Sequence, residues 1–209
     1  MKHLTYIFLV LIIFLSDCKN HNTNINTNTY MGVDIIDAYE LAFDRTYIFN
    51  DFNTFITEIG LPNTVSVFRD TISISSKEEL DKLIASSIQK GGTDIINLQY
   101  TGFQMGFMPD DRIVPENIDF RKTDKSIQYN GTTFDQTYTV DMFKKQFPSS
   151  GSFALDNEMS LFGMTTNERD EGLKHYMLLR KSKDDPYAEP TLELTFKNNK
   201  LIYIFFANF

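Results

Sequence analysis

Histidine, serine and cysteine are the side chains most often used for nucleophilic and acid–base chemistry, and few of them are well placed in this chain. Of the three histidines, His3 and His21 lie near the N-terminus, and only His175 lies in the main body of the sequence. Apolar residues alternate around it, as in a β-strand. We therefore expect His175 to be a packed or surface strand residue and not a catalyst.

A serine hydrolase would have to pair His175 with a suitably exposed serine. The Gly-x-Ser-x-Gly turn that exposes such a serine is absent, and the nearest candidate, Ser149–Ser152 after Pro148, is typical of an ordinary loop. Gly91-Gly92 is not followed by the Lys-Ser/Thr pair of a phosphate-binding loop. The sequence thus predicts no catalytic residues and a protein that is not an enzyme.

Acidic residues gather in three short segments: Asp110-Asp111, Glu168–Glu171 and Asp184-Asp185. Calcium needs several convergent oxygen ligands, and residues 166–172 offer suitable side chains without the spacing of an EF-hand. A hydrolase with two carboxylates could use such residues, but no spacing singles out a pair. We interpret these segments as solvated loops and expect neither a metal nor a cofactor.

The N-terminus has the pattern of an export signal. Lys2 precedes an apolar run from Leu4 to Phe14, and the polar pair Ser16-Asp17 then leads to Cys18, the only cysteine. The run is shorter than the ~20 residues that a transmembrane helix needs, and its length and flanks are those of a secretory signal. We expect residues 1–17 to be a signal peptide.

Leu15-Ser16-Asp17-Cys18 resembles the lipobox of bacterial lipoproteins, which signal peptidase II cleaves before the cysteine. Asp17 departs from the family, in which Gly, Ala or Ser normally holds that position. The resemblance implies that Cys18 carries a diacylglycerol on sulfur and a fatty acyl chain such as palmitate on nitrogen. It also implies a lipid-anchored protein of the cell envelope, with Lys19 favouring the outer membrane on its periplasmic or surface face.

The rest of the chain divides into a tether and a domain. Residues 18–30 hold Cys18 and an Asn-rich stretch too polar to bury apolar area, so we expect a disordered tether. Residues 31–209 have the length of a single domain. Without a second cysteine the core must rest on apolar packing, with 19 Phe available for it. A net charge of −8 argues against nucleic-acid binding.

Periodicity predicts the elements of this domain. Helices are expected over about residues 34–44, 52–59, 76–88 and 139–147. Strands are expected around residues 65–67, 72–74, 96–100, 103–107, 113–120, 127–129, 132–134, 173–180, 192–196 and 201–206. Asn130-Gly131 marks a hairpin, Leu80, Leu83, Ile84 and Ile88 should be the buried stripe of their helix, and 149–172 is expected to be a long polar segment.

This order predicts an α+β fold, an antiparallel β-sheet with helices packed on one face. A helix followed by a strand meander occurs twice, which suggests two helix–β-meander repeats. Such a pair resembles the architecture of β-lactamase inhibitor proteins and of small outer-membrane assembly lipoproteins. The resemblance implies a fold and no function.

Two hypotheses on function remain open, with a hydrolase of unknown type as a third. The first is a non-catalytic, tethered protein-binding domain, similar to an immunity protein or inhibitor, for which acidic residues and tyrosines suit a basic protein partner. The second is an envelope-maintenance or surface-assembly lipoprotein that binds an outer-membrane protein. In both, the partners are a membrane through the lipid anchor and a protein.

Overall fold

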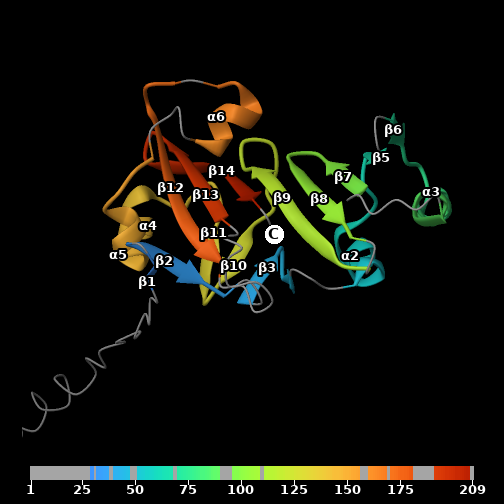
Figure 1. Ribbon diagram of the computed structural model, residues 1–209, viewed down its shortest axis with the longest axis horizontal. Coiled ribbons are helices and arrows are strands. Elements are labelled where there is room, and N and C mark those ends of the chain that lie inside the picture. Colours follow the sequence, from blue (N-terminus) through green and yellow to red (C-terminus); the bar gives the residue numbers. More distant parts are fainter. Residues whose placement is uncertain are drawn as a thin grey trace, which may run out of the picture.

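The computed structural model describes residues 29–30, 32–37, 40–47, 51–67, 70–89, 96–108, 111–155, 160–168, 170–180 and 191–207 (Figure 1). Cys18 and residues 1–17 lie outside this part of the chain, as do Gly91-Gly92 and Asp184-Asp185. The described sheet begins at Thr29, within the last two residues of the segment expected to be the tether.

Two antiparallel meanders form the centre of a ten-stranded sheet. Their last strands, β9 and β14, pair with each other, so that the two meanders meet at the middle of the sheet (Figure 1). The meanders are β7 (Ile96–Tyr100), β8 (Phe103–Phe107) and β9 (Ile113–Asp119), and β12 (Leu173–Arg180), β13 (Thr191–Lys197) and β14 (Lys200–Ala207). The remaining strands at the two edges are β1 (Thr29–Tyr30), β2 (Val33–Ile36), β5 (Thr64–Val67) and β6 (Asp70–Ser73).

A second sheet and most of the helices cover one face of the large sheet. The second sheet has the order β11 (Thr132–Phe134), β10 (Ile127–Tyr129), β3 (Leu41–Phe43) and β4 (Thr46–Tyr47). The helices are α2 (Phe52–Ile59), α3 (Lys77–Gln89), α4 (Val140–Gln146), α5 (Pro148–Gly151) and α6 (Leu161–Thr166). This arrangement confirms the predicted α+β class.

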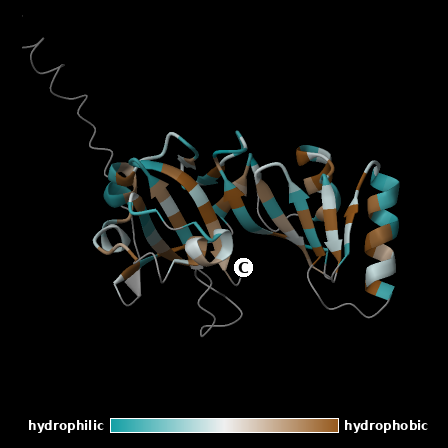
Figure 2. Cartoon of the chain, turned by 90° about the horizontal axis from the view of Figure 1, so that it is seen from above, coloured by the Kyte–Doolittle hydropathy of each residue, from teal (hydrophilic) through white to brown (hydrophobic). Residues whose placement is uncertain are grey.

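One main core joins these layers. The ring of Phe43 on β3 lies 4.8 Å from that of Phe103 on β8 and 6.1 Å from that of Phe55 on α2, centroid to centroid. Both rings belong to one cluster of buried side chains, whose members are spread along the chain from Ile36 to Phe206. Hydrophobic and hydrophilic residues alternate along the strands, as Figure 2 shows, because only one side of each strand faces this core.

The predicted N-terminus of α3 is confirmed in detail. The Ser76 hydroxyl accepts a hydrogen bond from the Glu79 backbone N–H at 3.2 Å. The Glu79 carboxylate accepts one from the backbone N–H of Ser75 at 2.9 Å, one residue earlier than in the usual capping box. The helix stands at one end of the molecule (Figures 1 and 2) and buries Leu80 and Ile84. The expected burial of Ile88 is wrong, since this side chain is 43 % exposed.

The prediction of a helix over residues 34–44 is also wrong. The chain forms β2 and β3 there, with Tyr39 outside the described residues. The β2 strand pairs in parallel with β12, where Ile35 lies opposite Leu179. The β3 strand pairs with β10. Pairing with strands more than 80 residues away in the sequence supplies the backbone hydrogen bonds that a helix would have made locally.

Residues 149–172 are not simply a long polar segment, because α5 and α6 lie within them. The Ser160 hydroxyl caps α6 by accepting a hydrogen bond from the Gly163 N–H at 3.2 Å. Glu193 on β13 accepts further hydrogen bonds from two backbone N–H groups of the first turn. A helix of six residues would be marginal alone, so its cap and its contacts with the sheet decide its position.

The turn at Gly102 lies close to the segment that contains Lys122 and Thr123. A Cβ atom at Gly102, with φ of +81°, would lie 2.9 Å from the backbone carbon of Lys122 and from Cβ of Thr123. At Gly131, with φ of +75°, a Cβ atom would meet nothing within 4 Å. Both replacements by alanine add the strain of a left-handed backbone, about 1–2 kcal/mol, and only Gly102→Ala adds a clash.

We therefore expect Gly102→Ala to lower the free energy of unfolding by clearly more than Gly131→Ala. Urea unfolding of both variants measures the difference. Equal losses would mean that the turn at Gly102 does not pack against Lys122 and Thr123.

Candidate functional site

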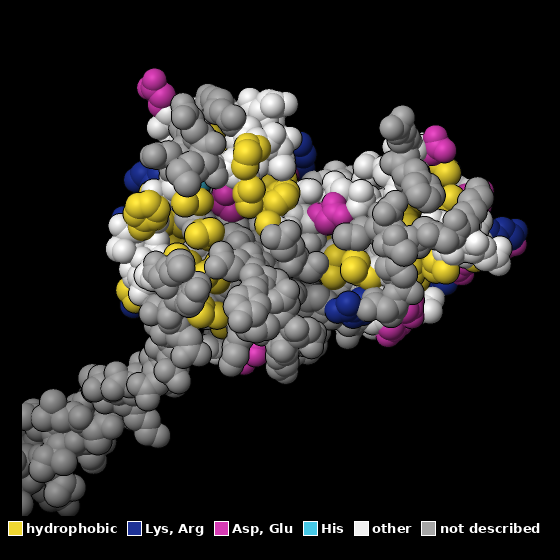
Figure 3. Space-filling model, in the orientation of Figure 1, with side chains coloured by type: hydrophobic (Ala, Val, Ile, Leu, Met, Phe, Trp, Pro, Cys, Tyr) yellow, Lys and Arg dark blue, Asp and Glu magenta, His cyan; other side chains and the backbone are white. Residues whose placement is uncertain are grey.

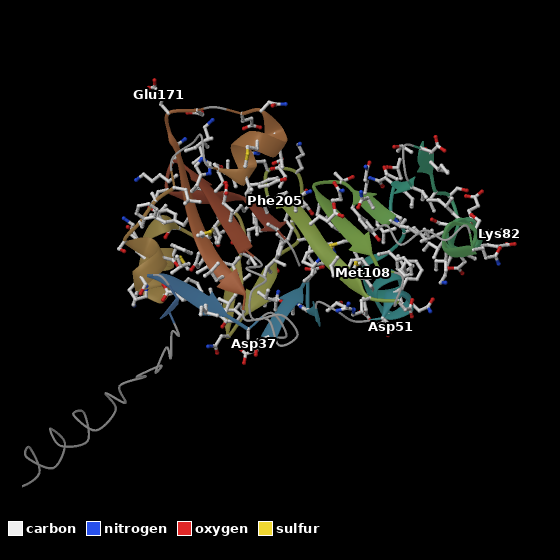
Figure 4. The ribbon with its side chains drawn as sticks, in the orientation of Figure 1. Asp37, Asp51, Lys82, Met108, Glu171 and Phe205 are labelled. Carbon is white, nitrogen blue, oxygen red and sulfur yellow. The ribbon has the colours of Figure 1, made fainter. Side chains whose placement is uncertain are left out.

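The face of the large sheet opposite the main core is divided into two unlike halves. Over β12, β13 and β14 it is covered by α6, whose Phe162 packs with Leu173 and Tyr203 in a small second core. In Figure 3 hydrophobic side chains gather beside α6. Phe205, labelled in Figure 4, lies between α6 and β9 and packs against this second core. Over β5, β7, β8 and β9, no helix of the described chain covers the face.

Three polar side chains are buried beneath α6, one from the residue that caps the helix and two from the strands below it. Ser160, His175 and Glu193 are 0 %, 1 % and 1 % exposed. The Ser160 hydroxyl donates to Glu193 Oε1 at 2.6 Å. Glu193 also accepts hydrogen bonds from the backbone N–H groups of Leu161 and Phe162, at 2.7 and 3.1 Å. Glu193 therefore fixes the first turn of α6 on the sheet.

His175 joins this group through a single ring nitrogen. Its Nδ1 lies 3.0 Å from the Ser160 hydroxyl, 3.0 Å from the Thr195 hydroxyl and 3.4 Å from Glu193 Oε1. Because Ser160 gives its one proton to Glu193, it can only accept from the ring, so Nδ1 carries the proton. The expectation of a packed strand histidine holds, and the sequence did not indicate these partners.

A serine, a histidine and a glutamate together invite comparison with a catalytic triad, but their geometry differs. In a triad the serine donates to one ring nitrogen and the carboxylate accepts from the other. Here the serine bonds the carboxylate directly, and both approach Nδ1. At 0–1 % exposure none of the three can meet a substrate. This group stabilises α6 on the sheet.

The surroundings of Glu193 favour the charged form of its carboxyl group. Burial alone raises the pKa of this carboxyl, but hydrogen bonds from His175, Ser160 and two backbone N–H groups outweigh burial and bring the pKa below its usual value. The carboxylate form is thus the one that the fold stabilises.

The uncovered half carries a network of amide and hydroxyl side chains, which we name the open face. It consists of Thr64, Ser66, Gln99, Gln104, Glu116 and Asn117. Gln99 accepts a hydrogen bond from Thr64 at 2.9 Å and donates one to Ser66 at 3.0 Å. Strand register places Gln99 opposite Gln104, and Gln104 opposite Asn117. All six side chains are partly exposed.

Glu116 interrupts the regular register of the open face. Gln104 pairs with Asn117 while Met105 pairs with Pro115, so Glu116 is the extra residue of a β-bulge. Gln104 Nε2 donates a hydrogen bond to its carboxylate. Burial raises the pKa of Glu116 to about 7, although the bond from Gln104 opposes this shift.

A cleft lies where the open face meets α6. It has a volume of about 500 Å³. Its floor holds Gln99, Gln104 and Asn117, and Tyr203 and Arg121 also line it. Burial raises the pKa of Tyr203 to about 12, so its hydroxyl keeps its proton at neutral pH.

Arg121 forms the wall of this cleft and links the two halves of the face. Its guanidinium binds both oxygens of Asp119 at 2.8 and 2.9 Å and both oxygens of Glu168 at 3.1 and 3.0 Å. It also lies 5.8 Å from the ring centroid of Phe162 on α6. Glu168, expected to be part of a solvated loop, is thus half of an ion pair, and Asp170 pairs with Lys197 at 2.6 Å.

A second hollow of about 630 Å³ lies on the other side of the turn that follows β9. It shares Tyr100, Phe103, Arg121 and Lys122 with the cleft. The rings of Tyr100 and Phe103 are stacked at 4.4 Å between centroids. Lys125 in this hollow is paired with Asp44, so its charge is neutralised within the chain.

The predicted site residues stand as follows. Cys18 lies outside the described residues, as do Asp110 and Asp184-Asp185. In the described part of the chain no three His, Cys, Asp or Glu side chains are placed to hold a metal ion. The sequence analysis missed the amides of the open face. Their alternation with the buried Leu98 and Met105 could have shown that they share one face.

No described helix is long and apolar enough to cross a membrane. Comparison of the chain with models of protein families, with curated proteins and with solved structures finds no match.

Proposed function

We propose that this chain is a membrane-anchored envelope lipoprotein whose α+β domain binds a protein partner through the open face. The observation that carries the proposal is the uncovered half of the sheet face with its linked amide and hydroxyl groups. These groups are held by a rigid sheet and by one another, so they lose little freedom when a partner covers them.

The alternative of catalysis receives less support. The group of Ser160, His175 and Glu193 is buried. Its hydrogen bonds connect the first turn of α6 to the sheet. The open face is broad, and most of its side chains are neutral amides and hydroxyls. Surfaces of this kind suit recognition of another protein, where polar contacts set the orientation and affinity comes from the whole area. The net charge of −8 favours a basic partner during association.

Charge placed on the open face should weaken this binding. We expect Ser66→Arg to reduce recovery of the partner when the native protein is captured from detergent extracts of its own envelope. Asn53→Arg is the matched control, because Asn53 is exposed on α2, on the other side of the sheet. The proposal fails if both variants recover the same proteins in the same amounts, measured by quantitative mass spectrometry.

The anchor rests on Cys18 and is tested separately. We expect mass spectrometry of the protein from its native membrane to show a chain that begins at Cys18 and carries a diacylglyceryl adduct and an acyl chain. The physical reason is that two or more chains hold a protein stably, at ~0.8 kcal/mol per buried CH₂. A free thiol at Cys18, or a chain that begins after it, would contradict the lipid anchor. The proposal that the open face binds a protein would not be affected by that result.

A further inference from the structure

The cleft between the open face and α6 differs from the rest of the face in being enclosed on two sides. Thr166, Glu168, Arg121 and Lys122 line it beside a floor of amides, and Arg121 and Glu168 are paired with each other. Its volume of about 500 Å³ lies within the range of small-molecule sites, about 300–1,000 Å³. We define the floor and the hydroxyl of Tyr203 as the amide cleft: Gln99, Gln104, Asn117 and Tyr203.

The charges around the amide cleft cancel within the chain. The Arg121 guanidinium uses Nε and both terminal nitrogens on Asp119 and Glu168. Lys122 Nζ lies 3.1 Å from Asp119 Oδ2. An anionic ligand would have to compete with these carboxylates for every cation, and a cationic ligand with the cations for both carboxylates. The electrostatics therefore favour a neutral ligand.

The amides offer both donors and acceptors to such a ligand. The bond from Asn117 Nδ2 to Gln104 Oε1 is long at 3.4 Å, so both groups can form shorter bonds to a ligand. Within the described chain no hydrogen bond to Asn117 Oδ1 is formed. The hydroxyl of Tyr203 keeps its proton at neutral pH and already interacts with the side chain of Thr165, so a bond from it to a ligand would replace that interaction.

These groups match a ligand that is rich in hydroxyls. Each hydroxyl donates one hydrogen bond and accepts two, and a side-chain amide presents a donor and an acceptor in one plane. An apolar ligand would leave these polar groups unpaired, at a cost.

We propose that the amide cleft binds a neutral saccharide. The inference goes beyond the proposed function and does not depend on it, because a sugar can enter the cleft when no protein covers the open face.

The test uses the full-length protein in a zwitterionic detergent without a sugar headgroup. Isothermal titration measures binding of maltotetraose, cellotetraose and tetra-N-acetylchitotetraose as neutral probes, with inorganic phosphate and tetragalacturonate as anionic probes. We expect saturable binding of at least one neutral probe. Failure of all three neutral probes to bind at millimolar concentration overturns the proposal, as does tighter binding of either anion.

Variants locate the binding. Asn117→Ala and Tyr203→Phe are each expected to weaken binding of the neutral probe by about tenfold. Gln128→Ala is the matched control, because Gln128 is an amide on the second sheet and lines a separate hollow with Asn130. Tyr203→Phe removes one hydroxyl and keeps the ring, so it tests the cleft even if Asn117→Ala does not fold. Unchanged affinity in a folded variant would overturn the assignment.

Discussion

Replacing Phe143 with alanine is expected to lower the free energy of unfolding by about 3–5 kcal/mol. Phe143 on α4 is 0 % exposed. Its ring lies 5.0 Å from that of Tyr176 and 5.9 Å from that of Phe196, centroid to centroid, and contacts Phe147 on its own helix at 5.4 Å. The loss would be a large share of a total stability of about 5–15 kcal/mol.

Lys145→Ala is the control for this experiment. Lys145 is exposed on the same helix, and substitutions at such positions usually change stability by no more than about 0.5 kcal/mol. Lys144 is less suitable, because its ammonium lies 6.0 Å from the Tyr176 ring and its backbone approaches Gly151. Denaturant midpoints decide the matter. Similar midpoints for the two variants would mean that α4 does not cover the sheet with this face.

Removal of Glu193 is the second change with a large expected effect. Glu193→Ala leaves the Ser160 hydroxyl and the N–H groups of Leu161 and Phe162 without their buried acceptor. Each buried donor left unsatisfied in this way costs about 1–3 kcal/mol. Hydrogen exchange should also show that the backbone amides of α6 lose protection before those of the central strands. Full protection of α6 in the variant would contradict its attachment through Glu193.

The stabilisation from Glu193 should also depend on pH. Its pKa in the folded protein is lowered from the usual 4.5, so the carboxylate stabilises the fold fully above about pH 4.5. The stabilisation is lost as the pH falls through the folded pKa. The difference in free energy of unfolding between the native protein and Glu193→Gln should therefore shrink on acidification below pH 4.5. A difference that stays constant with pH would contradict this assignment.

Local patterns in the sequence predicted the elements whose stability is local. Asn130 and Gly131 both have positive φ in the structure, at +48° and +75°, and form the predicted hairpin turn. Leu80 and Ile84, four positions apart, lie on the buried face of α3 as their spacing predicts. In each of these cases the partner of a side chain lies a few residues away in the sequence.

The errors have the opposite character. Residues 33–36 and 41–43 form strands because β12 and β10 lie beside them, and neither neighbour can be inferred from that segment. The group around His175 on β12 assembles from Ser160 at the start of α6 and from Glu193 and Thr195 on β13. The ion pair of Arg121 with Glu168 likewise depends on where α6 lies.

The sequence contains the pattern of polar residues in the candidate site, but not the reason why no described helix covers that face. Alternation along β7 and β8 indicates that Gln99 and Gln104 share a face, since Gln99 follows the buried Leu98 and Gln104 lies between the buried Phe103 and Met105. That this face stays uncovered while the other half lies under α6 depends on the packing of a short helix from a distant segment. The alternation could therefore have indicated a polar strand face, but it cannot distinguish a binding surface from a solvated one.

The most direct test of the open face as a binding surface is position-specific photo-crosslinking in the native host. A photoreactive amino acid at position 66 lies on the open face, and one at position 82 replaces Lys82, which points away from the sheet on α3 (Figure 4). We expect a discrete crosslinked protein from position 66 and none from position 82. Crosslinks of equal yield from both positions, or none from position 66, would contradict the account.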